Sequence, residues 1–228
     1  MKRLLLLLLL LPAFVVARPA FAQTEELLCD FSGYDYEDPD ADPTEFGAAG
    51  DYYNMFGFVT SVNPTYITAD YSTNEYTIEF WNLWSAGYFD FYPFRFITYT
   101  TGTIGLYEDP LCCGTPGTFG INPPNLTAPS SFLDGTLILG GNVDNFGLTL
   151  NLDDGTGNFT GDVHFDSGTQ VGNIPASATR VYTFAGLTSN PTAQVPEGYV
   201  HQVTGEIKIE LPVQNENTSW GRMKALYR

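Results

Sequence analysis

Short segments in which apolar and polar residues alternate, separated by Gly, Asn, Asp and Pro, are the feature that most limits what this chain can fold into. The clearest is FGLTLNLDDGTGNFTGDVHFD, residues 146–166. Each half gathers its apolar residues on one face, and they are Phe146, Leu148, Leu150, Leu152, Phe159, Val163 and Phe165. Gly155 and Gly157 between the halves suit the positive φ angles of a tight turn. The stretch predicts an antiparallel hairpin.

The same alternation recurs along the chain. In YVHQVTGEIKIELP, residues 199–212, Val203, Ile207 and Ile209 share one face, and Pro212 ends the strand. No heptad or long 3.6-residue pattern occurs after residue 22, so the chain reads as all-β with roughly nine to eleven short strands. We expect a two-sheet antiparallel sandwich of jelly-roll type over residues 53–212, with an open meander as the second choice.

An outer-membrane β-barrel is a further alternative for a β-rich exported chain. Such a barrel needs lipid-facing apolar alternation along every strand. Here the alternation breaks at Pro93 and again across the loop-like stretches 106–131 and 189–198. We therefore rank the barrel behind the sandwich.

The first 22 residues predict a secretory signal peptide. Lys2 and Arg3 precede the apolar run Leu4–Leu11, and AFA at 20–22 supplies the small residues that cleavage needs. We expect cleavage after Ala22 and export to the periplasm, the cell surface or the extracellular space. The apolar run is too short and too interrupted for a membrane span, so no transmembrane helix is expected in the mature chain.

Charge narrows the choice of partners. The full chain carries a net charge of −17, and removal of three basic residues with the signal peptide takes it to −20. Such a body repels nucleic acid and attracts cations and basic partners, so nucleic-acid binding is excluded for it. Many of the acidic residues lie in the segment 23–52, which we interpret as an acidic N-terminal segment separate from the sandwich domain.

Three cysteines are an odd number for an oxidising compartment. Cys29 has two candidate disulfide partners, Cys112 and Cys113, and either pairing leaves one thiol over. The sequence does not choose between them.

Nine aromatic residues fall within residues 80–96. They form either part of the core, the interpretation we favour, or a platform on which sugar rings stack. In the second case the glycan-binding residues are Trp81, Trp84, Tyr88, Tyr92, Asp90 and Arg95.

The acidic segment offers a candidate calcium site whose ligands are Asp35, Asp38, Asp40 and Asp42. The alternating carboxylates suit calcium, but Pro43 and Ala49 stand where the helix-loop-helix motif needs its glycine and glutamate. A solvated acidic loop is the favoured alternative.

Signs of catalysis are weak. His164 shares a strand face with Asp162 and Asp166, and we interpret this as an exposed polar face. His201 is predicted to be a partly buried edge histidine. No nucleophile, metalloprotease or phosphate-binding motif occurs. A glycosidase needs only two carboxylates, and the sequence does not pick out a pair. We expect a protein without enzymatic activity.

The basic ending NTSWGRMKALYR follows a polar linker, within residues 213–228. Its candidate contact residues are Trp220, Arg222, Lys224 and Tyr227. This tail either docks on the acidic body, which we favour, or binds a protein partner.

Together these features predict an exported, non-catalytic β-sandwich that acts as a binding or structural module of the cell surface or envelope. A glycan-binding module or glycoside hydrolase using residues 80–96, and an outer-membrane barrel, are the alternatives.

Overall fold

The computed structural model describes residues 23–38, 45–111, 132–175, 182–189, 195 and 198–212. Residues Glu25–Glu210 form one compact unit, and the two chain ends form another, so the description below concerns the first. Its elements are β1 Gln23–Asp38, β2 Tyr52–Val62, β3 Asn74–Phe91, β4 Phe94–Tyr99, β5 Gly102–Pro110, β6 Thr136–Asn151, β7 Gly157–Ser167, the 3₁₀ turn η4 Val171–Asn173, β8 Tyr182–Ser189 and β9 His201–Pro212.

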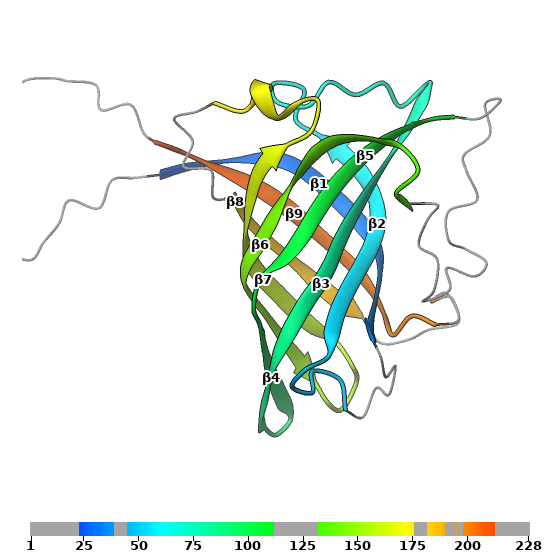
Figure 1. Cartoon of the computed structure of the whole chain (residues 1–228). Helices are drawn as coiled ribbons and strands as arrows, with labels where there is room; N and C mark the ends of the chain where they lie inside the picture. The colour runs from blue at the N-terminus through cyan, green and yellow to red at the C-terminus, as the bar shows by residue number, and fades with distance from the viewer. Residues whose placement is uncertain are drawn as a thin grey trace, which may run out of the picture. The chain divides into compact units, whose positions relative to one another are not determined.

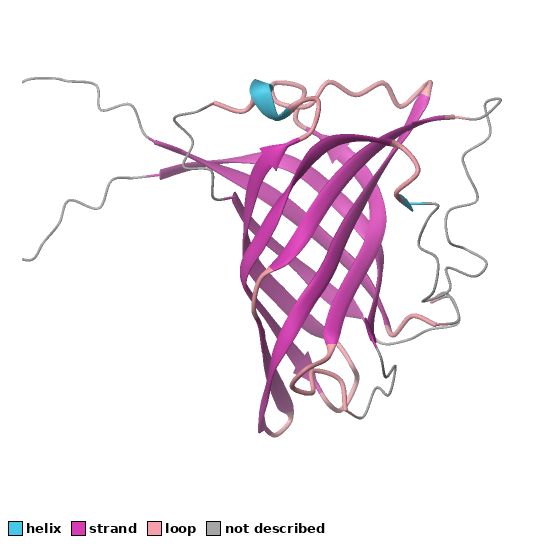
Figure 2. Ribbon diagram, viewed as in Figure 1, coloured by secondary structure: helices cyan, strands magenta, loops and turns pink. Residues whose placement is uncertain are grey.

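The strands form a closed antiparallel barrel (Figures 1 and 2). Neighbours around it run β1, β2, β3, then β5 and β4, then β6, β7, β8, β9 and back to β1. The short strands β4 and β5 follow one another between β3 and β6, so nine strands make eight positions around the barrel.

The all-β prediction is confirmed, but the jelly-roll sandwich is wrong. Bulges explain how one sheet closes on itself: the register shifts at Asp30/Phe31, Tyr53/Met55, Ser85/Gly87 and Asp144/Gly147, among others. Each bulge adds local twist and bends its strand, and closure leaves no sheet edge exposed. The segment 23–52 contributes β1, which is part of this barrel.

The barrel interior is filled with aromatic rings. Phe31 lies 5.5 Å from Phe80 and 6.4 Å from Phe159, and Phe146 lies 5.9 Å from Phe159 and 5.2 Å from Tyr53, all between ring centroids. Residues that alternate with these face outward, and on β7 and β9 they are polar. The hairpin of β6 and β7 is confirmed, with Phe159, Val163 and Phe165 buried; Leu152, however, lies beyond β6 and is 42% exposed. Gly155 has the expected positive φ of 68°, whereas Gly157 already belongs to β7.

A second apolar cluster covers the outer face of β1 and β2. Tyr36 and Phe56 are buried there against Phe132, which precedes β6, and Tyr199, which precedes β9. Trp81 packs on Phe56, with 5.7 Å between ring centroids. Residues that precede β6 and β9 therefore cover part of the outer face of β1 and β2.

Candidate functional site

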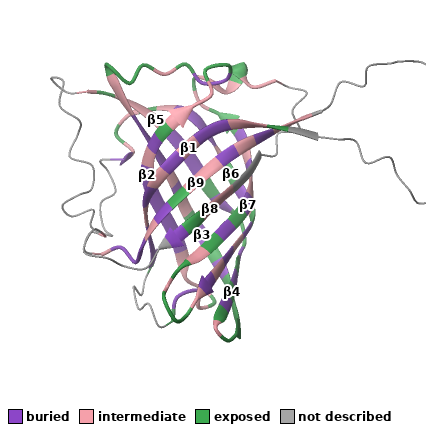
Figure 3. Ribbon diagram, turned by 180° about the vertical axis from the view of Figure 1, so that it is seen from behind, coloured by how far each residue is buried: buried purple, intermediate pink, exposed green. Residues whose placement is uncertain are grey.

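A hairpin of β3 and β4 presents aromatic rings on its outer face. Phe89 pairs with Phe96, and Phe91 pairs with Phe94, so the four rings share one side of the ribbon. Their side chains are 66%, 42%, 68% and 41% exposed, in that order. Figure 3 shows this end of β4 as exposed. Large rings left in solvent on one face are typical of a binding surface.

The opposite face of the hairpin is held by Arg95. Its guanidinium makes two hydrogen bonds to the Asp90 carboxylate, at 2.8 and 3.0 Å, and lies 3.7 Å from the centre of the Tyr88 ring. A third bond, of 3.0 Å, reaches the carbonyl oxygen of Phe46. The hydrogen bonds from Arg95 lower the pKa of Asp90. Because Arg95 fixes the inner face, the outer rings are presented on a braced ribbon.

The predicted glycan-binding residues therefore separate into two groups. Trp84, Tyr88, Asp90, Tyr92 and Arg95 lie on or beside this hairpin, and Trp84 and Tyr92 are 43% and 75% exposed. Trp81 lies apart from them, against Phe56. The interpretation of residues 80–96 as core is wrong for the hairpin, although Phe80 is fully buried.

A hollow of about 360 Å³ adjoins the aromatic face. Its lining residues are Phe94, Thr149, Asn151, Thr156, Gly157, Asn158, Leu187 and Thr188. The Thr188 hydroxyl is buried and has no hydrogen-bond partner among the described residues. The Leu187 side chain stands 62% exposed at the rim. Amide and hydroxyl groups thus lie directly beside the rings.

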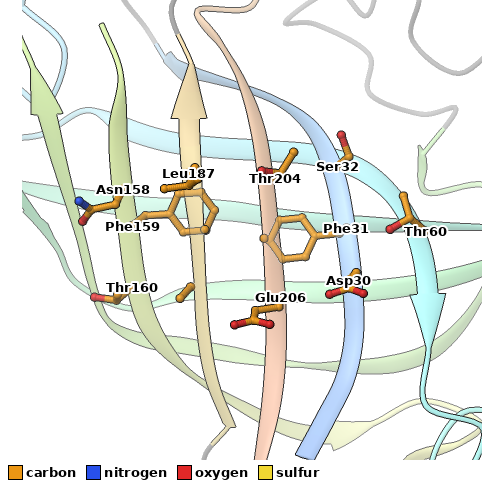
Figure 4. Close-up of a pocket in the computed structure, with 13 residues that line it drawn as sticks. Asp30, Phe31, Ser32, Thr60, Asn158, Phe159, Thr160, Leu187, Thr204 and Glu206 are labelled. Carbon is orange, nitrogen blue, oxygen red and sulfur yellow. The ribbon is translucent and has the colours of Figure 1, made fainter.

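A larger groove of about 740 Å³ crosses the outer wall from β7 to β2 (Figure 4). Two inward-facing glycines explain it. A Cβ on Gly186 would stand 2.2 Å from a ring carbon of Phe159, and one on Gly205 would stand 2.4 Å from a ring carbon of Phe31. Because these two rings pack directly on the glycine backbone, β8 and β9 lie close to the core at this point. The outer surface over them is therefore concave.

Hydroxyls, an amide and two carboxylates line the outer side of this groove. They belong to Asp30, Ser32, Thr60, Asn158, Thr160, Thr204 and Glu206, and Figure 4 shows them on β9 and on the strands to either side. Asp30 accepts a 2.6 Å hydrogen bond from Ser61, and Glu206 lies 2.6 Å from the Lys208 ammonium. The exposed surface of the groove is mostly apolar along its floor and at Ala185 and Leu187, and these polar groups stand around it.

At the hairpin end, the barrel interior holds a buried acid–histidine network. Asp35, fully buried, accepts hydrogen bonds from the backbone N–H of His201 at 2.8 Å and from the Tyr53 hydroxyl at 3.0 Å. Its carboxylate also lies 3.0 Å from Nδ1 of His201. Burial lowers the pKa of His201, but the charge and hydrogen bond of Asp35 outweigh it, so the pKa lies above its usual 6.5. His201 is an interior residue, so its expected place at a partly buried edge is wrong.

Glu37, two residues along the same inner face, holds a loop that plugs the barrel. It accepts a 2.7 Å bond from the Gly47 backbone N–H and a 2.8 Å bond from the Tyr99 hydroxyl. The neighbouring Phe46 ring lies edge-on to His201, with 5.2 Å between ring centroids. Burial raises the pKa of Glu37 to about 7, against the lowering effect of these two hydrogen bonds.

The calcium prediction is altered by this placement. Asp35 belongs to the buried network, Asp38 is exposed at the end of β1, and Asp40 and Asp42 lie outside the described residues. Within the part of the chain that the structure describes, no group of three or more His, Cys, Asp or Glu side chains could hold a metal ion. Calcium binding around Asp38 stays a prediction.

Of the remaining predicted residues, Cys29 alone lies within the described part of the chain. Cys29 is a buried free thiol, and burial raises its pKa; Cys112 and Cys113 lie outside the described residues. The signal peptide and the tail residues Trp220, Arg222, Lys224 and Tyr227 lie outside them too.

Sequence reasoning missed Glu37, Tyr53, Tyr99 and the two wall glycines, Gly186 and Gly205. One signal was available: Asp35 and Glu37 have the same parity as Phe31, which is a core residue. A carboxylate on the apolar parity of a strand points into the core, and a buried carboxylate needs a partner. The glycines carry no comparable signal because their role depends on rings from other strands.

The described residues contain no helix long and apolar enough to cross a membrane. No protein-family model, no curated protein and no solved structure matches the chain.

Proposed function

We propose that the chain is an exported, non-catalytic binding module whose ligand is a neutral glycan, held on the outer face of the β3–β4 hairpin and in the hollow beside it. The observation that carries this proposal is the juxtaposition of exposed rings, such as Phe91 and Phe94, with the amides of Asn151 and Asn158. Aromatic rings cover the apolar face of a sugar, and amide and hydroxyl groups bond its hydroxyls.

Charge favours a neutral ligand over an acidic polymer or a membrane surface. The mature chain carries a net charge of −20, which repels polyanions. Asp153 also stands next to the hairpin, where it accepts a 2.6 Å hydrogen bond from the Tyr92 hydroxyl. Inserting the hairpin into lipid would bury this carboxylate at high cost.

The alternative of an outer-membrane barrel is less favoured by the outer wall. Such a barrel needs a continuous apolar band facing lipid. Here the outward positions of β7 and β9 are Asn158, Thr160, Asp162, His164, Asp166, Gln202, Thr204, Glu206, Lys208 and Glu210.

The test is a glycan array with the chain from residue 23 onward, followed by calorimetry on the best neutral ligand. We expect the double variant Phe91→Ala/Phe94→Ala to weaken binding by about tenfold or more, the loss of about 1.4 kcal/mol or more that hot-spot rings give. Tyr71→Ala is the matched control, because Tyr71 is 44% exposed near the other end of β3. Absence of binding by the intact protein to any neutral glycan would refute the proposal.

A further inference from the structure

We propose that the ligand is an extended linear glycan, whose chain leaves the aromatic hairpin and continues along the groove over Gly186 and Gly205 to β1 and β2. This inference rests on the proposed function and adds the form of the ligand and a second, longer part of its site.

The first support is continuity. The hollow beside the hairpin and the wall groove share Asn158 and Leu187, so the two depressions meet at one place on the outer surface. The path crosses β4, β6, β7, β8, β9, β1 and β2 in their order around the barrel. Within it, the wall groove from β7 to β2 makes four steps between strands about 4.8 Å apart, a path of about 19 Å, which suits a chain of several sugar units rather than a single sugar.

The second support is that the groove is built into the core. Ring carbons of Phe159 and Phe31 occupy the space where a Cβ on Gly186 or Gly205 would lie. Phe31 and Phe159 are 2% and 0% exposed and are locked against each other and against Phe80 and Phe146. The hollow is therefore present before a ligand arrives, and a preformed site avoids the cost of ordering one.

The third support is the chemistry of the lining. Ser32, Thr60, Thr160 and Thr204 offer hydroxyls that both donate and accept, and Asp30 and Glu206 offer acceptors for pairs of sugar hydroxyls. The lining contains two carboxylates and no Lys or Arg, and the Lys208 ammonium beside it is paired with Glu206, which together disfavour a polyanion. The groove exposes mostly apolar surface, from its floor, Ala185 and Leu187, and the hydroxyl and carboxylate groups lie around that surface. A neutral, polyhydroxylated chain suits it, because each sugar ring has an apolar face and a rim of hydroxyls.

The experiment compares ligand lengths on two surfaces of the barrel. The probes are β-1,4-linked oligosaccharide series of glucose, xylose and N-acetylglucosamine, from disaccharide to hexasaccharide, titrated into the mature protein. We expect hexasaccharide affinity in the preferred series to exceed disaccharide affinity by about tenfold or more, as a second set of contacts worth about 1.4 kcal/mol requires.

The variant Ala185→Trp/Thr204→Trp fills the groove from outward-facing positions, and should bring hexasaccharide affinity down to the disaccharide value while leaving disaccharide binding unchanged. Asn142→Trp, on the outer face of β6 away from the path, is the control and should leave both affinities unchanged.

Three results would overturn the inference. If short and long ligands bind with equal affinity, and Phe91→Ala/Phe94→Ala abolishes the binding of both, the hairpin is a binding site and the groove is not. An unchanged hexasaccharide affinity in the filled variant would do the same. Binding of a lysine-rich peptide in the groove, with no response to any oligosaccharide, would remove the proposed function as well.

Discussion

Replacing Glu37 with Gln should make the protein more stable at pH 8 and barely change it at pH 5. The Glu37 side chain is 1% exposed, and its pKa is raised from 4.5 to about 7, chiefly by burial. Between these two values the folded state holds a proton that the unfolded state has lost, so unfolding becomes easier as the pH rises. Glutamine keeps the shape and an acceptor for the Gly47 N–H but never ionises.

The size of the effect follows from the interval between the two pKa values. Each pH unit inside that interval changes the free energy of unfolding by about 1.36 kcal/mol, so the stability of the variant relative to the natural protein should grow by about 2–3 kcal/mol from pH 5 to pH 8. For a domain of this size that corresponds to about 5–10 °C in Tm.

The assay is urea unfolding of both proteins, followed by tryptophan fluorescence, at several values between pH 5 and pH 8.5. Comparing the two at each pH cancels the titration of the many other carboxylates. Glu45→Gln, an exposed position in the same loop, is the matched control and should stay within about 0.5 kcal/mol of the natural protein throughout. The reasoning is refuted if the difference in free energy of unfolding between Glu37→Gln and the natural protein does not vary with pH. Glu37 would then have the same pKa in the folded and unfolded states.

Two further predictions concern the packing of the barrel. The Phe46 ring, 2% exposed, fills the barrel at the end that carries the β3–β4 hairpin and packs on His201 and Tyr53. Phe46→Ala should lower the free energy of unfolding, measured in urea, by about 3–5 kcal/mol. A decrease of less than about 1 kcal/mol would show that the ring is not packed there. Gly205→Ala places a methyl group 2.4 Å from a Phe31 ring carbon and should lower the free energy of unfolding by about 1–3 kcal/mol. In the control Gly172→Ala the methyl group meets no atom within 4 Å, so the free energy of unfolding should change by less than about 0.5 kcal/mol. Equal changes in the two variants would contradict the account of the groove.

The strands could be predicted from the sequence, and their closure could not. Alternation of apolar and polar residues on β6, β7 and β9 identified buried faces that the structure confirms, such as Val203 and Ile207. The same alternation serves a sandwich and a barrel equally, because each strand needs only one apolar face. What separates them is long-range pairing, above all that of β1 with β9, which closes the sheet. Local patterns carry no information on those partners.

The hairpin shows a different limit. On β4, Arg95, Ile97 and Tyr99 are buried while Phe94 and Phe96 are exposed, so bulky residues occupy both faces. Hydrophobicity alone favoured burial of all of them. The decisive contact is the bond from Arg95 to the carbonyl of Phe46, a residue 49 positions away that fills the barrel end. Only the folded structure shows which face of β4 points into the core.

Inside and outside of this barrel are therefore linked. Ring-on-ring packing from Phe80 through Phe31, Phe159 and Phe146 fills the interior, so the depressions that can receive a ligand lie on the outer wall. The interior nevertheless shapes that wall: inward glycines hollow it, and Arg95 braces the ribbon that carries the exposed rings. Because both features depend on buried contacts, substitutions in the core at Phe31 or Phe159 should change the outer groove without touching a ligand. Substitutions on the polar outer face should change binding without changing the fold.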